Sequence, residues 1–151
     1  KSVAIGHGAH MRITDDYDPS LPATLGDADQ LTQVFLNLLK NASEATRGAA
    51  GEIRLRTYYD HGLRVRGADG KSRALPLQIE VIDSGPGIPP EIAGELFEPF
   101  VSGRENGTGL GLALVSKIIS EHGGWVSVDS KPGRTCFRIS LPVAPKSLET
   151  N

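Results

Sequence analysis

Three segments within thirty residues decide the fold: DSGPGIP at 83–89, LFEPF at 96–100 and GTGLGL at 107–112. The first fixes the carboxylate of Asp83 in a tight turn, where it can accept a hydrogen bond from the exocyclic amine of a base. In the last, glycines run directly into an apolar helix, so backbone N–H groups can face phosphate oxygens. Together the segments predict a site that holds a nucleotide.

Length and composition are typical of one globular domain. The 151 residues are 38% hydrophobic and 23% charged, with a net charge of −2, so no bulk field favours nucleic acid or a membrane surface. The single cysteine, Cys136, can form no internal disulfide, which fits a reducing compartment. No apolar run is long enough to span a membrane and no signal peptide is visible. We therefore expect a cytoplasmic domain over residues 11–142, between a disordered start or linker remnant (1–10) and a disordered tail (143–151).

Hydrophobic periodicity predicts the order β–α–β–β–α–β–β. An edge strand at 11–17 precedes a helix that Asp27 caps, with Gln30 completing a capping box. Strands at 52–59 and 77–83 form a hairpin with a long polar tip. A short helix at 90–96 is followed by a longer one from Thr108 or Gly109 to Glu121, and strands at 125–129 and 135–141 close the domain. This order predicts a two-layer α/β sandwich, with helices on one face of a mixed, mainly antiparallel sheet.

Two carboxamides lie four residues apart on the first helix. Asn37 and Asn41 therefore point the same way, and burying them unpaired beside an apolar stripe would be costly. An amide oxygen is a good ligand for a Mg²⁺ ion that already carries waters and phosphate oxygens. The alternative is that this pair caps a neighbouring loop.

The two glycine segments also have simpler interpretations. Asp83 could lead an ordinary turn, because Asp, Ser, Gly and Pro are all turn formers. The segment 107–111 matches neither the dinucleotide fingerprint nor the Walker loop, but a plain linker would not run into a strongly amphipathic helix. Arg104, the strong cation just before these glycines, could close over terminal phosphates or could be a solvated surface residue.

As a set, these segments resemble the catalytic ATP-binding domain of bacterial sensor histidine kinases, within the ATPase class shared with gyrase, Hsp90 and MutL. Residues 33–45 look like the N box, 83–89 the G1 box, 96–100 the F box and 107–112 the G2 box. The resemblance covers residues 26–142 and implies the Bergerat ATP-binding fold. A finer likeness to the nitrogen-regulation subgroup rests on 100–105, on the turn at 132–135 and on the insertion between Tyr58 and Leu77.

The resemblance also implies roles for individual residues. Asn41 would coordinate Mg²⁺, Asn37 would line the phosphate site, and Asp83 would bind the adenine amine. The remaining residues implied to hold ATP are Gly85, Gly87 and Ile88 beside the base, Thr135 near it, and Gly107, Thr108, Gly109, Leu110, Gly111 and Leu112 in the lid and the helix that follows.

The chain departs from the family pattern at two positions. Many of these kinases carry Lys three residues after the Mg²⁺-binding Asn, whereas Glu44 stands here, so phosphate neutralisation would fall more heavily on Arg104 or Lys40. Gyrase-type ATPases place a water-activating Glu where this chain has Asn37. This second difference argues for phosphoryl transfer, with Asn37 and Arg104 as the catalytic candidates, and against fast hydrolysis.

None of the four histidines lies in a phosphoacceptor box. The resemblance therefore implies a protein-histidine kinase domain that passes the ATP γ-phosphoryl group to a histidine on a separate dimerisation domain, and indirectly to a response regulator of the NtrC type. The alternatives are an ATP hydrolase of the gyrase kind and a regulatory module whose nucleotide state controls docking of a PII-like signal protein.

Overall fold

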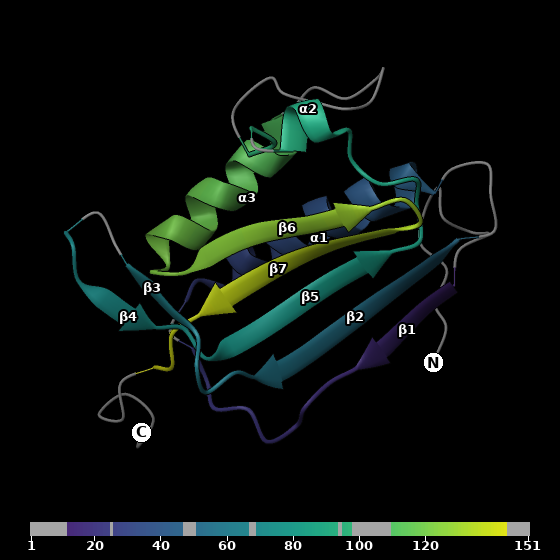
Figure 1. Ribbon diagram of the computed structural model, residues 1–151. Helices are drawn as coiled ribbons and strands as arrows, with labels where there is room; N and C mark the ends of the chain where they lie inside the picture. The colour runs from purple at the N-terminus through teal and green to yellow at the C-terminus, as the bar shows by residue number, and fades with distance from the viewer. Residues whose placement is uncertain are drawn as a thin grey trace.

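The computed structural model describes residues 12–24, 26–46, 51–66, 69–93, 95–97 and 110–144. It has the expected two layers: one face of a five-stranded sheet carries the long helices, and the other face is open (Figure 1). The elements are β1 (Arg12–Asp16), α1 (Ala28–Ala45), β2 (Glu52–Tyr59), β3 (Arg64–Arg66), β4 (Ser72–Ala74), β5 (Leu77–Asp83), α2 (Pro90–Ala93), α3 (Leu110–Glu121), β6 (Trp125–Lys131) and β7 (Arg134–Leu141).

The sheet has the strand order β1-β2-β5-β7-β6. Only the edge strand β1 runs parallel to its neighbour, β2, and every other pair is antiparallel. The prediction of a mixed, mainly antiparallel sheet is therefore confirmed. β5 lies at the centre and ends at Asp83, opposite Thr135 of β7.

The tip of the β2–β5 hairpin contains structure that the sequence analysis did not predict. β3 and β4 pair there as a separate two-stranded sheet, with Val65 opposite Arg73. Each strand has only three residues, too few for a period of two to stand out from a polar loop. The described part of the polar segment, residues 69–71, does form a turn, and β3 and β4 flank it.

Asp27 caps α1 as predicted, because its Oδ1 accepts hydrogen bonds from the backbone N–H groups of Asp29 and Gln30 at 2.9 and 3.1 Å. The second half of the predicted capping box is wrong. The N–H of Asp27 donates instead to Nε2 of His122, at 3.0 Å. Nδ1 of His122 lies 2.7 Å from the Ile118 carbonyl oxygen. The imidazole thus links the start of α1 to the end of α3.

α2 begins and α3 ends where they were predicted to, whereas the predicted start of α3, at Thr108 or Gly109, lies outside the described residues. α2 ends at Ala93, so the expected helix to Leu96 is too long, and Leu96 lies in a turn. α3 ends at Glu121, and the N–H of Gly124 reaches back to the carbonyl of Ile119 at 2.9 Å. Gly123 has φ +74°, the left-handed conformation that commonly closes a helix.

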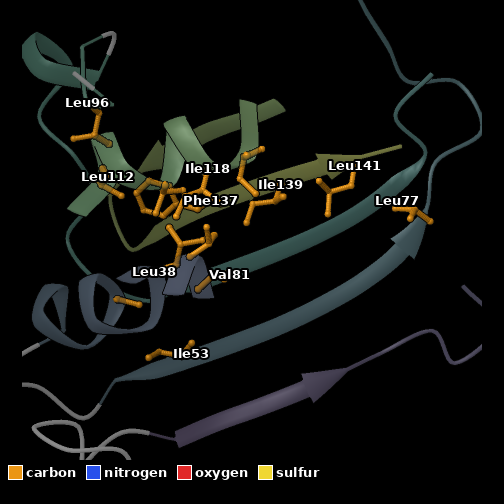
Figure 2. Packing of buried hydrophobic residues seen from close by; sticks show 14 residues of the cluster. Leu38, Ile53, Leu77, Val81, Leu96, Leu112, Ile118, Phe137, Ile139 and Leu141 are labelled. Carbon is orange, nitrogen blue, oxygen red and sulfur yellow. The ribbon is translucent and has the colours of Figure 1, made fainter. Parts of the chain in front are cut away.

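The core fills the space between the helices and the sheet (Figure 2). Val34, Leu38 and Ala42 repeat along α1 with helical spacing and are buried, so the predicted apolar stripe is confirmed. They face the odd-numbered residues of β2, β5 and β7, which point to the same side of the sheet. The largest buried apolar side chains are Phe137, Leu38, Ile53, Ile119, Ile139, Val34, Val81 and Val115.

The open face is polar but still contains buried groups. Glu80 is 3% exposed and accepts hydrogen bonds from Tyr58 Oη at 3.1 Å and from Arg138 Nε at 3.0 Å, with Arg56 Nη1 at 3.4 Å. Cys136, on the same face, is also buried. Desolvation, then the charge of Glu80, raises the pKa of its thiol from 9.0 to about 11.

Packed structure continues past the expected domain end at residue 142. Ala144 is buried, and its N–H donates to the carbonyl of Ala23 at 2.8 Å. The predicted start (1–10) and residues 145–151 of the predicted tail lie outside the described residues. Among the described helices, none is long and apolar enough to cross a membrane.

Candidate functional site

Three polar side chains stand in a row at one end of the helix-covered face. Asp83 on β5 pairs in register with Thr135 on β7, which pairs in register with Ser130 on β6. Cross-strand partners point to the same face of a sheet, so these side chains are neighbours. We call this row, together with Gly85 and Ile88 of the following turn, the turn cluster.

The carboxylate of Asp83 is fixed by the turn that it begins. Asp83 is 2% exposed, and its Oδ1 accepts a hydrogen bond from the N–H of Gly85 at 2.9 Å. A Cβ atom on Gly85 would lie 2.9 Å from that oxygen and 2.9 Å from the carbonyl oxygen of Ala45. Only glycine allows the turn to approach the end of α1 so closely. The local geometry predicted for Asp83 and Gly85 is present.

The turn then lies against the β6–β7 hairpin. Gly87 has φ +95°, and a Cβ atom there would lie 2.9 Å from the carbonyl oxygen of Lys131. The next residue, Ile88, donates its N–H to Oγ of Ser130 at 2.8 Å, and Oγ of Ser130 lies 3.0 Å from Oγ1 of Thr135. Ser130 therefore joins the turn to the buried Thr135, and the sequence analysis missed it.

A second set of candidate residues gathers where α1 faces the start of α3. Asn37 and Asn41 are half-buried one turn apart on α1. Gly111 lies opposite: a Cβ atom on it would be 4.0 Å from Oδ1 of Asn37. We call Asn37, Asn41 and Gly111 the helix cluster. Here a carboxamide and the first turn of α3 face one another.

Helix α1 joins the two clusters. Asn37 lies at the helix cluster, whereas Ala45, two turns later, touches the turn cluster at Gly85. Eight residues of α-helix rise about 12 Å. The clusters are therefore separated by a distance that suits the base and the phosphates of one nucleotide.

The other candidates are placed less directly. Lys40 is exposed on α1. Leu112 is buried in the core, so its side chain supports α3 from within. For Leu110 the structure gives only a backbone position at the start of α3. Arg104, Gly107, Thr108 and Gly109 lie outside the described residues.

The described part of the F box contributes to packing. Leu96 is buried, and the ring of Phe97 meets the ring of Phe137 edge-on, with centroids 6.1 Å apart. Phe137 is 1% exposed at the centre of the core. These contacts fix the chain after α2, at the point from which it continues toward α3.

A cavity of about 430 Å³ lies elsewhere, between the β3–β4 hairpin and the turn from α3 to β6. Val65, Arg66, Arg73 and Trp125 are among its lining residues. It contains no candidate residue from either cluster, so we do not assign the nucleotide to it.

The side chains that could bind a cation in the helix cluster are carboxamides, and not carboxylates, imidazoles or thiolates. Across the described ranges, no group of three His, Cys, Asp or Glu side chains could hold a metal ion. The oxygens of the helix cluster are carboxamide oxygens, which suit Mg²⁺ when phosphate oxygens and water complete its shell. The donor set therefore fits a Mg²⁺ ion that arrives with a nucleotide, and not an all-protein metal cage.

The known proteins that this chain resembles point to one family. The family model described as "Histidine kinase-, DNA gyrase B-, and HSP90-like ATPase" matches residues 26–145. The chain is 76% identical over 148 residues to the sensory histidine kinase/phosphatase NtrB of Rhodobacter capsulatus, covering 98% of this chain and 41% of that protein. It is 50% identical to NtrB of Azospirillum brasilense, covering 91% of this chain and 35% of the relative. The chain thus spans less than half the length of these relatives.

Solved structures similar to this chain include histidine kinases. The mycobacterial sensor histidine kinase MprB matches with a TM-score of 0.72 and 27% identity, over 91% of this chain and 86% of the other. The catalytic domain of histidine kinase ThkA, in a nucleotide-free form, matches with a TM-score of 0.71 and 28% identity, over 91% and 82%. The predicted fold class is confirmed by these neighbours.

Proposed function

Because the chain belongs to the family of histidine kinase-, DNA gyrase B- and HSP90-like ATPases, we propose that it is the ATP-binding catalytic domain of an NtrB-like sensor histidine kinase. In this proposal the domain passes the γ-phosphoryl group of ATP to a histidine on a separate dimerisation domain. The observation that carries it is the placement of two complementary clusters along α1, in a chain 76% identical to an NtrB. The turn cluster holds the base, and the helix cluster holds the phosphates.

At the base, Asp83 accepts a hydrogen bond from the adenine amine. The buried carboxylate is already oriented by the N–H of Gly85, so binding requires little rearrangement. Gly85 and Gly87 leave the turn without side chains where the ligand, α1 and the hairpin approach it. Ile88 and Thr135 complete the walls of this end.

At the phosphates, Asn37 and Asn41 present amide oxygens and N–H₂ groups, and the first turn of α3 presents backbone N–H groups. Asn41 is the proposed ligand of Mg²⁺, which when bound would neutralise charge on the phosphate oxygens. Lys40 and Arg104 are the proposed cations, and Gly107, Thr108, Gly109 and Leu110 form the proposed lid. These roles stay predictions for the residues outside the described ranges.

We propose that the chain positions the γ-phosphoryl group for transfer and supplies no general base. The carboxamide of Asn37 cannot accept a proton from water at neutral pH, so the chain has no group at this position to activate a hydrolytic nucleophile. Orientation of the γ-phosphoryl group and charge neutralisation would supply the rate enhancement. The acceptor histidine then comes from outside the chain.

The direct test mixes this chain with a separately produced dimerisation domain, whose acceptor histidine is intact, and γ-labelled ATP. We expect label on the added domain and little free phosphate from the chain alone. Asp83→Asn serves as a binding-deficient control. A folded, ATP-bound chain that labels no histidine would overturn the kinase proposal, whereas rapid phosphate release by the chain alone would favour the ATP hydrolase.

The proposal also covers the partner proteins of the domain and its location in the cell. The resemblance to the nitrogen-regulation subgroup supports an NtrC-type response regulator as the eventual phosphate acceptor and a PII-like signal protein as a regulator that docks on the domain. It also supports a cytoplasmic location, where ATP is supplied. Binding of a purified PII-type protein, measured with and without ATP, would test the regulatory part.

A further inference from the structure

Ser130 connects two parts of the turn cluster that are distant in sequence. Its Oγ lies 2.8 Å from the N–H nitrogen of Ile88 and 3.0 Å from Oγ1 of Thr135. Thr135 is 3% exposed, and its other cross-strand neighbour is Asp83. Ser130 therefore lies behind Thr135, on the side away from Asp83.

The Ser130–Thr135 hydrogen bond allows two directions, because either hydroxyl can donate. A hydroxyl group donates one hydrogen bond and accepts up to two. Ile88 N–H occupies one acceptor position of Ser130. If Thr135 donated to Ser130, the half-buried hydroxyl of Ser130 would turn its own hydrogen toward solvent, because within the described residues its oxygen is hydrogen-bonded only to Ile88 and Thr135. If Ser130 donates to Thr135, its own hydrogen is used and the hydrogen of Thr135 can point into the site.

We infer that Ser130 is a positioning residue that sets purine specificity by turning the hydroxyl hydrogen of Thr135 toward the base. This inference rests on the proposed function and deepens it. The site then presents an acceptor, the carboxylate of Asp83, beside a donor, the hydroxyl of Thr135. Adenine presents the complementary pair, an amine beside a ring nitrogen acceptor. Guanine presents the reverse pair, a carbonyl oxygen beside a ring N–H, and meets like groups at both positions.

The hydroxyl of Ser130 also holds the turn at residues 83–89 in place against the β6–β7 hairpin. A Cβ atom on Gly87 would lie 3.2 Å from Oγ of Ser130, so the turn rests directly on this hydroxyl. Loss of the hydroxyl could thus loosen the turn as well as free Thr135. An experiment must separate these effects, and discrimination between two purines does so because a loosened turn weakens both.

The experiment measures the affinity of the chain for Mg·ATP and Mg·GTP by calorimetry, for wild type, Ser130→Ala, Thr135→Val and the double variant. Ser127→Ala is the matched control, because Ser127 lies on the same strand, pairs with Arg138 and points to the open face. Ser130→Thr, which keeps a hydroxyl, is the conservative variant. Thermal unfolding of each variant shows that it is folded.

We expect Ser130→Ala to bind ATP about 10-fold more weakly, which is the loss of about 1.4 kcal/mol, and GTP unchanged. Ser130→Thr should restore most of the preference, and Ser127→Ala should match wild type. The double variant should be no weaker than Thr135→Val, because Ser130 acts through Thr135. Equal weakening of ATP and GTP, or additive losses in the double variant, would overturn the inference while wild type still preferred ATP. A wild-type chain that binds neither nucleotide would instead overturn the proposed function, and this inference with it.

Discussion

The turn cluster and the helix cluster are built in opposite ways. In the turn cluster, hydrogen bonds join Ile88 to Ser130 and Ser130 to Thr135, and the N–H of Gly85 holds the carboxylate of Asp83, which pairs in register with Thr135. In the helix cluster, the half-buried side chain of Asn37 makes no hydrogen bond within the described residues, whereas Asn41 does interact with another group. One end of the site is therefore formed before a ligand binds. At the other end, the carboxamide of Asn37 is available to a ligand and its ion.

The largest expected effect is at the turn cluster. Asp83→Asn replaces a carboxylate oxygen by an N–H₂ donor, which would face the donor amine of adenine. A hydrogen bond to a charged group contributes about 1.5–3 kcal/mol, so we expect about a 100-fold loss of affinity. Calorimetry should show the same loss for ATP and for adenosine. Unchanged adenosine affinity would remove Asp83 from the base site.

The second prediction separates the stability cost of a close contact from the cost of backbone strain at a glycine with positive φ. Gly87→Ala forces an L residue into φ +95° and places Cβ 2.9 Å from the Lys131 carbonyl oxygen, so we expect a loss of about 2 kcal/mol of unfolding free energy. Gly133→Ala is the matched control, because Gly133 has φ +87° but a Cβ there would meet nothing within 4 Å. Denaturant unfolding of both variants measures the difference. Equal losses would mean that the contact with the hairpin costs nothing.

A third prediction tests the helix cluster by itself. Asn41→Ala should weaken Mg·ATP about 10-fold, a loss of about 1.4 kcal/mol, and leave adenosine binding unchanged, because the change lies at the phosphate end. Gln33→Ala, an exposed carboxamide on the same helix, is the control. Titrations with and without Mg²⁺ measure the effect. A parallel loss for adenosine would show that the two ends are not separate.

A smaller effect is expected where α1 and α3 are linked far from either cluster. His122→Ala removes the acceptor for the N–H of Asp27 and one contact to Ile118, so stability should fall by about 1 kcal/mol. Thermal or denaturant unfolding measures it, and adenosine affinity should not change. A large loss of adenosine affinity would show that the link between the helices also holds the turn cluster.

The smallest effect concerns Cys136, which follows Thr135 on β7. The raised pKa, about 11 against 9.0, keeps the thiol protonated in the folded chain. The unfolded chain loses this proton first, so Cys136 contributes stability below pH 9 that declines as pH rises from about 9 to 11. Cys136→Ala should flatten this part of the stability profile. At pH 8 a thiol reagent should react slowly with or without ATP; rapid reaction that ATP suppresses would contradict a preformed turn cluster.

Features of the fold and the site that depend on a short stretch of sequence could be predicted. Asp83 and its glycines lie within five residues, and the stripe of α1 follows one helix, so both could be recognised. Ser130 could not, because its bond to Ile88 joins residues 42 apart in the chain. The Asp27–His122 bond spans 95 residues, which is why the capping box was expected in its place. The short strands β3 and β4 were missed because three residues carry too little periodicity.

The central position of β5 has a consequence for how the domain opens. β5 is hydrogen-bonded to β2 on one side and β7 on the other, so its amides should exchange with solvent only when the whole sheet opens. Asp83 is the last residue of that strand. Local fraying at the start of α3 would therefore leave the carboxylate in place, because Asp83 is held by the strand whose amides should exchange most slowly.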